Sequence, residues 1–284
     1  MILLADGGST KVDWCLTGQG AIIKRVFTRG ANPFFRTAED ISSEIRCALV
    51  PELKDHRIDA ICFYGAGCAF PEKNEIIRTA IAENFDVKRI EVGSDLFGAA
   101  VGLCGHRAGI ACILGTGSNS CFYDGEKIVE NVSPLGFILG DEGSGAVLGR
   151  LFIGSCLKNQ LTGGLKEAFL AFIKLDNAGI LDRVYRQPLP NRFLASICPF
   201  IREHLRDESV HGLVHGAFAD FFRRNVMQYD YRNHRVSFAG SVAFHFKDVL
   251  CEVADGLNIE IGAIAQSPME GLVEYYALPS YDIH

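Results

Sequence analysis

The chain contains the same strand-and-turn pattern twice, 108 residues apart. The first copy reads MILLADGGST over residues 1–10, and the second reads IACILGTGSNS over residues 110–120. In each copy an apolar run of strand length leads into small residues, where the backbone can approach a ligand closely. A further strand is expected after each turn, over residues 12–17 and 120–123. The repeat predicts an internal duplication, with one copy at the start of each half of the chain.

Composition indicates an ordinary globular protein with room for two domains. The 284 residues are 48% hydrophobic and 22% charged, which suffices for sizeable cores. A net charge of −6 gives no general attraction to nucleic acid or anionic membranes, and no apolar run reaches membrane-spanning length. The ten cysteines form no CxxC or CxxH pair. Free thiols in a reducing compartment, and hence a cytoplasmic protein, are expected.

The order of the expected elements divides the chain into residues 1–106 and 107–284. The first part follows the plan β-β-β-α-β-α-β. The second part starts with the second copy of the repeat, becomes helical over about 161–228, and returns to strands and helices afterwards. Within the helical region, Gly212 and Gly216 lie four residues apart and predict a close helix contact.

Several residues of the two turns have the chemistry of a phosphate site. Backbone N–H groups and hydroxyls of the following residues can face phosphate oxygens: Gly7, Gly8, Thr10, Gly115, Thr116 and Gly117. Asp6 is placed to help hold Mg²⁺ through water molecules, because magnesium keeps several of them. Lys11 either assists the phosphates or is solvated. A third strand–glycine junction, at Gly240-Ser241, is a natural place for the base and ribose of a nucleotide.

Carboxylates and amides near the ends of expected strands suit sugar hydroxyls. Asp95 follows a strand and opens a small-residue helix, so it is either a helix cap or a ligand-facing base. Asn32 either starts a turn before proline or faces a ligand. Asp141 lies among glycines, where it opposes a helix dipole or faces a ligand. Asn119 completes this group.

Six motifs together resemble one known family. In order they are DGGST, GANP, SDLFGAA, LGTGSN, LGFILGDEGSG and AGSVA. This series is similar to the N-acetylglucosamine kinase family, within the BadF/BadG/BcrA/BcrD-type ATPases of the actin-like superfamily. The resemblance covers nearly the whole chain except residues 161–228. It implies an α/β fold with two actin-like (ribonuclease H-like) domains, each a mixed β-sheet flanked by helices, with an interdomain cleft. The helical region becomes an insertion in the second domain, and the last helix is allowed to pack back on the first.

The resemblance also implies a role for each matching residue. Asp95 would be the base that takes the proton of the sugar 6-hydroxyl. The implied ATP-binding residues are Asp6, Gly7, Gly8, Ser9, Thr10, Lys11, Gly115, Thr116, Gly117, Ala239, Gly240 and Ser241. The implied sugar-binding residues are Asn32, Asp95, Ser118, Asn119, Leu135, Gly136 and Asp141.

These roles imply a kinase that uses ATP and Mg²⁺ to phosphorylate an amino sugar, N-acetylglucosamine being the first candidate. One departure from the family pattern keeps glucosamine or another hexosamine open: residues 133–136 read SPLG where the family often has tryptophan, and the only tryptophan is Trp14. A second alternative is an ATPase that activates a partner enzyme through an iron–sulfur cluster, for which Cys68 is the cysteine to consider. A homodimer is compatible with either function.

Overall fold

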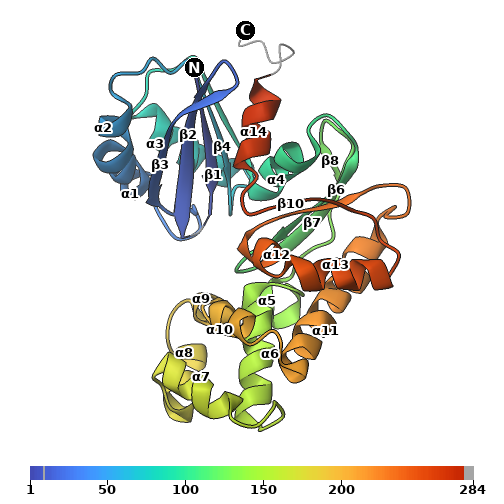
Figure 1. Cartoon of the computed structure of the whole chain (residues 1–284). Coiled ribbons are helices and arrows are strands. Elements are labelled where there is room, and N and C mark those ends of the chain that lie inside the picture. Colours follow the sequence, from blue (N-terminus) through green and yellow to red (C-terminus); the bar gives the residue numbers. More distant parts are fainter. Residues whose placement is uncertain (9, 278–284) are drawn as a thin grey trace. The chain divides into compact units, whose positions relative to one another are not determined.

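The computed structural model describes residues 1–8 and 10–277, and the chain forms two compact units (Figure 1). Unit 1 comprises Met1–Ala108, Tyr123–Ile128 and the chain from Ser267 on. Unit 2 comprises Gly109–Phe122 and Val129–Gln266. Each unit is built around one mixed five-stranded sheet flanked by helices, which is the α/β class expected from the sequence.

The sheet of unit 1 has the strand order β3-β2-β1-β4-β5. Its strands are β1 (Ile2–Gly7), β2 (Lys11–Gly18), β3 (Ala21–Arg29), β4 (Ala60–Gly65) and β5 (Arg89–Ser94). The pairs β1–β2 and β2–β3 are antiparallel, whereas β1, β4 and β5 are parallel. The carboxyl ends of the three parallel strands therefore meet at one edge, where Gly7 pairs with Gly65 and Gly65 pairs with Ser94.

Helices cover the sheet of unit 1 because its central strands β1 and β4 are buried along nearly their whole length, whereas the edge strand β3 is largely exposed. They are α1 (Ala38–Glu44), a π-helical turn (Ile45–Leu49), α2 (Val50–Leu53), α3 (Pro71–Ala82), α4 (Asp95–Cys104) and α14 (Met269–Tyr276). Leu3 and Ala5 of β1 share a core with Ile41 of α1 and Ile77 of α3. Helix α14 packs on α4 and β1. The π-helical turn lies between α1 and α2, and the Thr37 hydroxyl caps the start of α1 by accepting the N–H of Asp40 at 3.3 Å.

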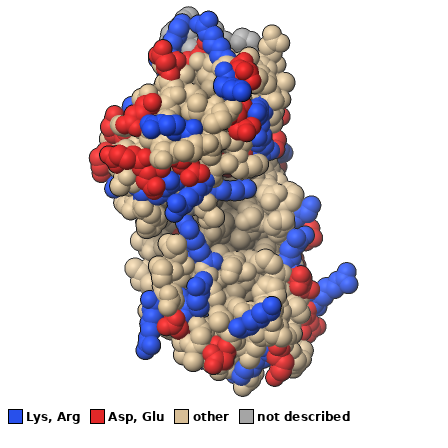
Figure 2. Space-filling model, turned by 90° about the vertical axis from the view of Figure 1, so that its left-hand side faces the viewer, with Lys and Arg blue, Asp and Glu red and all other residues tan. Residues whose placement is uncertain are grey.

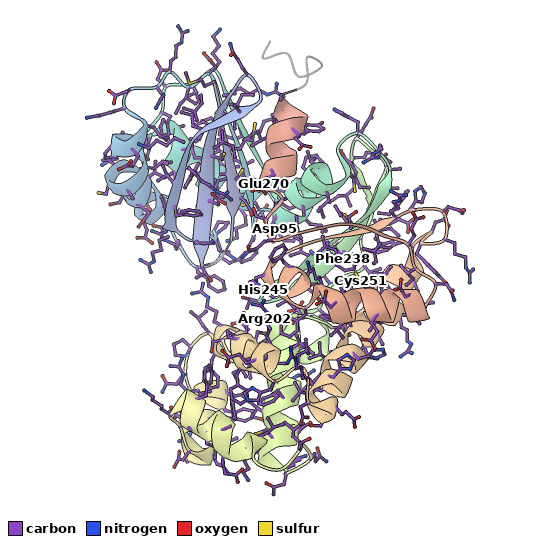
Figure 3. The ribbon with its side chains drawn as sticks, in the orientation of Figure 1. Asp95, Arg202, Phe238, His245, Cys251 and Glu270 are labelled. Atoms are coloured by element: carbon purple, nitrogen blue, oxygen red, sulfur yellow. The ribbon has the colours of Figure 1, made fainter. Side chains whose placement is uncertain are left out.

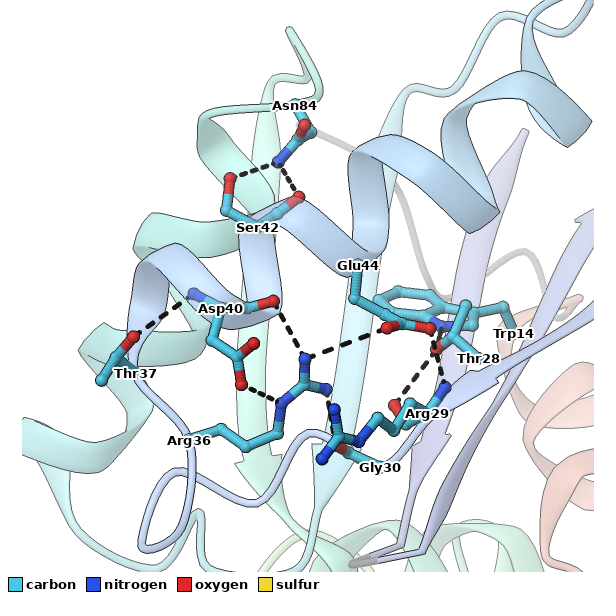
Figure 4. A network of polar contacts seen from close by, with 10 residues as sticks. All are labelled: Trp14, Thr28, Arg29, Gly30, Arg36, Thr37, Asp40, Ser42, Glu44 and Asn84. Carbon is cyan, nitrogen blue, oxygen red and sulfur yellow. Dashed lines mark hydrogen bonds and ion pairs between the residues drawn. The ribbon is translucent and has the colours of Figure 1, made fainter.

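A polar network fixes the loop that follows β3 (Figure 4). The Arg36 guanidinium donates to the Gly30 carbonyl oxygen at 2.8 Å and to the Asp40 carboxylate at 2.6 Å. The Trp14 indole N–H, drawn to the right of Arg36 in Figure 4, donates to the Thr28 hydroxyl at 2.9 Å inside the core. The loop carrying Asn32 is therefore anchored at both ends.

The sheet of unit 2 has the strand order β8-β7-β6-β9-β10. Its strands are β6 (Gly109–Leu114), β7 (Ser118–Tyr123), β8 (Ile128–Glu130), β9 (Val236–Ala239) and β10 (Ile261–Ala265). Strands β6, β9 and β10 are parallel. This order repeats that of unit 1: three strands consecutive in sequence, followed by two added beside the first of them. Such a repeat is what the predicted duplication requires.

Unit 2 carries most of the helices. They are α5 (Gly136–Leu139), α6 (Gly145–Leu157), α7 (Leu165–Ile173), α8 (Asn177–Tyr185), α9 (Pro190–Ala195), α10 (Cys198–Glu203), α11 (Glu208–Arg224), a 3₁₀ turn (Val226–Gln228), α12 (Ser241–His245) and α13 (Lys247–Gly256). Rings of Phe152, Phe169 and Phe200 pack edge to face in the core of this helical part. Helices α12 and α13 are separate because Phe246, which lies between them, leaves helical geometry (φ −112°, ψ 20°).

Two surface properties follow from the described residues. Within 1–8 and 10–277 no helix is long and apolar enough to cross a membrane. On the face shown in Figure 2, acidic and basic side chains lie interspersed with uncharged ones, as expected for a chain whose net charge is only −6.

Candidate functional site

Asp95 is the first residue of α4, at the carboxyl end of β5. The helix is capped by the preceding residue, since the Ser94 hydroxyl accepts the N–H of Phe97 at 3.1 Å. The carboxylate of Asp95 accepts the N–H of Leu96 at 2.9 Å. Burial raises the pKa of Asp95, and this hydrogen bond acts in the opposite direction. The capping role considered from the sequence belongs to Ser94, which leaves Asp95 available for chemistry.

Asp6 lies near the end of β1, at the same edge of the sheet. Its carboxylate accepts the hydroxyl of Ser267 at 3.0 Å. Burial raises the pKa of Asp6 to about 6, and repulsion from the Asp95 carboxylate contributes in the same direction. Two carboxylates thus influence each other at the ligand-binding edge expected of a parallel sheet. A cation between or beside them would relieve this repulsion.

The other predicted residues of unit 1 make contacts within the protein that do not by themselves indicate a ligand. The buried Asn32 side-chain oxygen accepts the Phe34 N–H at 3.0 Å, which is the turn-forming role considered from the sequence. The Lys11 ammonium lies 4.9 Å from the ring centroid of Phe27. Thr10 is exposed, while Ser9 lies outside the described residues. The roles of these residues toward a ligand stay predictions.

The first glycine turn is closed by backbone hydrogen bonding, with the N–H of Gly8 donating to the Lys11 carbonyl at 2.9 Å. Gly7 sits tightly against the core, because a Cβ there would lie 2.5 Å from the Phe63 ring.

Cys68, the cysteine considered for an iron–sulfur cluster, is only 2% exposed, and burial raises the pKa of its thiol to about 12. A buried, protonated thiol is a poor surface ligand for a metal cluster.

The second glycine turn, in unit 2, is attached to the start of α6. The N–H of Gly145 donates to the Gly115 carbonyl at 2.8 Å, and the N–H of Ala146 donates to the Thr116 carbonyl at 3.1 Å. The Gly115 N–H donates to the Gly117 carbonyl at 2.9 Å. These bonds hold the turn rigidly, with the Thr116 side chain exposed.

Asp141 is brought onto this turn from 24 residues further along the chain. Its carboxylate accepts the N–H of Ser118 at 3.3 Å, and a Cβ on Gly117 would lie 3.1 Å from one of its oxygens. Burial raises the pKa of Asp141 to about 6; the Ser118 hydrogen bond lowers it and the charge of Glu142 raises it. Ser118 and Asp141, which the sequence assigned to one ligand, are therefore neighbours.

The remaining predicted residues of the sugar group lie on β7 and on the segment before Asp141. The half-buried Asn119 side-chain oxygen accepts the Ser120 N–H at 2.9 Å and the Asn131 amide at 3.0 Å. Leu135 is 60% exposed and has left-handed backbone geometry at φ 59°. Gly136 follows at φ 74°. A bulky residue with positive φ is uncommon, and such strain is often found at functional sites.

A pocket of about 320 Å³ opens beside the second glycine turn. Gly115, Thr116 and Ser241, which were assigned to one nucleotide from the sequence, all line this pocket. Their role in nucleotide binding stays a prediction. The other lining residues are Ala195, Ser196, Cys198, Pro199, Arg202, Val242, His245 and Phe246. Figure 3 shows Arg202 and His245 beside each other. Five of these lining residues come from α9, α10 and the turn between them. They were not predicted from the sequence, because no motif marks them.

Glycines bring the walls of this pocket together. A Cβ on Gly240, which has φ 118°, would lie 2.3 Å from the Leu114 carbonyl oxygen, so the loop after β9 can approach β6 only without a side chain. A Cβ on Gly149 of α6 would lie 2.0 Å from the Leu194 carbonyl oxygen, so α9 packs directly on the backbone of α6. Gly149 is one of three glycines in α6, and a Cβ on Gly154 would meet nothing within 4 Å, so the sequence alone does not show which glycine another segment packs against.

The raised pKa of Asp141 predicts a specific pH dependence of stability. Because the folded state binds its proton more tightly than the unfolded chain does, the unfolding free energy falls as pH rises from about 4 to about 6. We expect Asp141→Asn to be more stable than the unmodified chain at pH 8, by about 1 kcal/mol because solvent screens this partly exposed carboxylate, and equally stable at pH 4. Urea unfolding at the two pH values measures this difference.

Asp124 supplies a control of opposite sign. Its pKa is lowered, chiefly by hydrogen bonds from the backbone N–H groups of Lys127 and Glu126. Asp124→Asn is therefore expected to lose stability at pH 8 relative to pH 4. Equal effects of Asp141→Asn at both pH values would contradict the proposed burial of its charge.

Comparisons with known proteins agree with this arrangement. No family model matches the chain. A crystal structure from Porphyromonas gingivalis, of a protein provisionally assigned as an N-acetylglucosamine kinase, is 50% identical, with a TM-score of 0.92 over 98% of this chain and 99% of that one. The N-acetylmuramic acid/N-acetylglucosamine kinase of Clostridium acetobutylicum is 28% identical over 203 residues, which is 68% of this chain and 66% of that protein, just under two thirds.

A more distant likeness shows the fold. A ROK family glucokinase from Streptomyces griseus, solved with glucose and AMPPNP, has a TM-score of 0.57 at 15% identity over 96% of this chain and 97% of that one. This likeness concerns the fold. The 50% identity over 98% of this chain shows that it belongs to the N-acetylglucosamine kinase family.

Proposed function

We propose that this protein transfers the γ-phosphoryl group of ATP to the 6-hydroxyl of an amino sugar, with N-acetylglucosamine as the preferred substrate. The observation that carries the proposal is the 50% identity, over 98% of the chain, to the Porphyromonas gingivalis protein assigned to that activity. The name of the Clostridium acetobutylicum relative adds N-acetylmuramic acid as a second sugar to test.

The pocket of unit 2 supports nucleotide binding. Thr116, which lines the pocket within the second glycine turn, can offer its backbone N–H to phosphate oxygens. Beyond it, apolar atoms of Val242, Phe246 and Pro199 line a space of about 320 Å³, which suits a purine base and its ribose. The hydroxyls of Thr116 and Ser241 give polar contacts at the rim.

Asp95 is the proposed general base. A base must accept the proton of the sugar hydroxyl as that hydroxyl attacks phosphorus, and it does so best when its pKa approaches the working pH. Burial moves the pKa of Asp95 in this direction. The hydrogen bond from the Leu96 N–H fixes one carboxylate oxygen and thereby orients the other.

Asp6 fits a role beside Mg²⁺. Magnesium binds hard oxygen ligands and is held through one or two carboxylates, water and nucleotide phosphates rather than by a full protein cage. Accordingly, the described part of the chain holds no group of three or more His, Cys, Asp or Glu side chains that could bind a metal alone, while Asp6 has the charge of Asp95 nearby. When bound, the ion would neutralise charge on the β- and γ-phosphates.

Phosphorus NMR of the reaction product tests this function directly. Incubation with MgATP and N-acetylglucosamine is expected to give a phosphomonoester whose phosphorus couples to the two protons on C6. Coupling to the anomeric proton, or no phosphomonoester at all, would contradict the proposal.

Blocking the pocket should separate nucleotide binding from sugar binding. Ser241 is exposed at the pocket rim, so Ser241→Trp can fill the space without disturbing the core. We expect the KM for MgATP to rise about tenfold or more, equivalent to about 1.4 kcal/mol, with the sugar KM unchanged. Steady-state kinetics with each substrate varied in turn measure both constants. Tyr185→Trp, at a side chain of unit 2 that is 79% exposed and outside the pocket lining, serves as the control. An unchanged KM for MgATP in the Ser241 variant would place the nucleotide elsewhere.

A further inference from the structure

The two sugar-binding segments proposed for unit 2 are both tied to one short stretch outside the family motifs. The segments are Ser118–Asn119 on β7 and Leu135–Asp141 before α6. The stretch is residues 224–229, which covers the end of α11 and the 3₁₀ turn that follows it. None of its residues was singled out from the sequence.

The first tie holds the residue next to Asp141. Glu142 is only 9% exposed, and each of its carboxylate oxygens has a partner. One accepts the Asn225 amide at 3.2 Å, and the other pairs with the Arg224 guanidinium at 2.7 Å. Asn225 is itself 5% exposed. Because a buried carboxylate is costly without such partners, they fix the turn at Asp141.

The second tie runs through the hydroxyl of Tyr229, a side chain that is 5% exposed. This hydroxyl donates to the Ser120 carbonyl at 2.9 Å and accepts the N–H of Val132 at 2.7 Å. It also contacts the Ser120 hydroxyl at 2.9 Å. One side-chain atom therefore joins β7, just after Asn119, to the chain that leads into Leu135.

Hydrogen bonds from a surface residue, Asn131, also join β7 to the chain that leads into Leu135. The exposed Asn131 amide donates to the Asn119 side-chain oxygen at 3.0 Å and to the Ser120 carbonyl at 2.7 Å. Asn119 is thus oriented by Asn131, and Ser120 is held by both Asn131 and Tyr229.

We infer that Tyr229, Asn225 and Asn131 are positioning residues for sugar binding: they hold Asn119 and Asp141 in one relative geometry. This inference rests on the proposed function. Hydrogen-bonding groups recognise a sugar only when several converge in fixed positions, so loosening their supports weakens sugar binding first. The nucleotide pocket is lined by other residues, none of them Asn119, Asn131, Asp141, Asn225 or Tyr229, and should be affected little.

Tyr229→Phe removes one oxygen atom and keeps the ring. We expect the KM for the sugar to rise about tenfold, which corresponds to about 1.4 kcal/mol, while the KM for MgATP stays within twofold of the unmodified enzyme. A role in stability alone would lower the melting temperature and leave both constants unchanged, so the contrast between the two constants is the decisive readout. Tyr231→Phe, two residues further on, is the matched control.

Asn131→Asp keeps the inference testable if Tyr229→Phe does not fold. Asn131 is exposed, so its replacement carries little risk to folding, yet aspartate would present a carboxylate to two oxygen atoms where an amide had donated. The same selective rise in the sugar KM is expected. Unchanged sugar KM values in both variants would overturn the inference.

The unmodified enzyme separates this inference from the proposed function. If it shows no sugar-dependent turnover, the proposed function fails. If it turns over and the two variants have sugar constants equal to its own, only the positioning role fails.

Discussion

Asp95→Asn is expected to lower kcat with the sugar by two to four orders of magnitude, the range typical of losing a general base. The amide keeps the shape of the carboxylate and cannot accept the proton. The KM for MgATP should change little, because the proposed nucleotide pocket belongs to unit 2. Steady-state turnover, measured over several sugar concentrations, determines both constants.

Loss of folding will not explain this result. The raised pKa of Asp95 means that its charge costs folding free energy at neutral pH, so the neutral variant should be at least as stable as the unmodified chain. Asp86→Asn, at an exposed position, is the control for the substitution itself. A kcat near that of the unmodified enzyme would remove Asp95 from the mechanism.

Gly271→Ala is expected to destabilise unit 1 by about 3 kcal/mol, at the upper end for overpacking. Helix α14 crosses α4 at this residue, and a Cβ would lie 1.7 Å from the Gly102 carbonyl oxygen. Because the obstacle is backbone, relief requires the helices to move apart. Thermal and urea unfolding measure the loss.

The control for Gly271→Ala is the same substitution at Gly212, in the middle of α11. Nothing lies within 4 Å of a Cβ built there, so the intrinsic preference of helices for alanine should stabilise this variant by up to about 1 kcal/mol. The expected signs are therefore opposite. Similar losses in both variants would show that the α4–α14 contact is looser than the structure indicates.

These two glycines also show where sequence reasoning failed. The pair Gly212 and Gly216, four apart on one helix, predicted a close helix contact, and that prediction was wrong: a Cβ on either would meet nothing within 4 Å. The close contact joins Gly102 and Gly271, which are far apart in sequence. Spacing along one helix is visible in a sequence, whereas the partner of a glycine on another helix is not.

Local patterns, by contrast, predicted the sheets well. Strand periodicity followed by glycine turns gave both copies of the repeat, and the strand order β3-β2-β1-β4-β5 recurs as β8-β7-β6-β9-β10. The break at Phe246 escaped prediction, because neither glycine nor proline marks it. From the sequence, Asp95 was either the cap of α4 or a ligand-facing base. Ser94 and Asp95 are both good capping residues, and only the backbone geometry shows that Ser94 is the cap.

Local sequence patterns also predicted part of the candidate site, namely the residues that lie on strands and turns. Motif residues on strands and turns, such as Ser118 and Asp141, come together as the sequence suggested. The pocket wall formed by Cys198 and Arg202, and the supports at Asn225 and Tyr229, depend on how the helices within unit 2 pack together and on its sheet. Contacts between residues so far apart in the sequence are not marked by any sequence motif.

Release of ADP from MgATP, measured by a coupled assay in the presence of single sugars, tests the central claim most directly. The panel is N-acetylglucosamine, N-acetylmuramic acid, glucosamine, N-acetylmannosamine, glucose and no sugar. We predict turnover with N-acetylglucosamine far above the sugar-free rate and above that with glucose. Equal ADP release with and without sugar, or none under any condition, would contradict the assignment of this protein as an amino-sugar kinase.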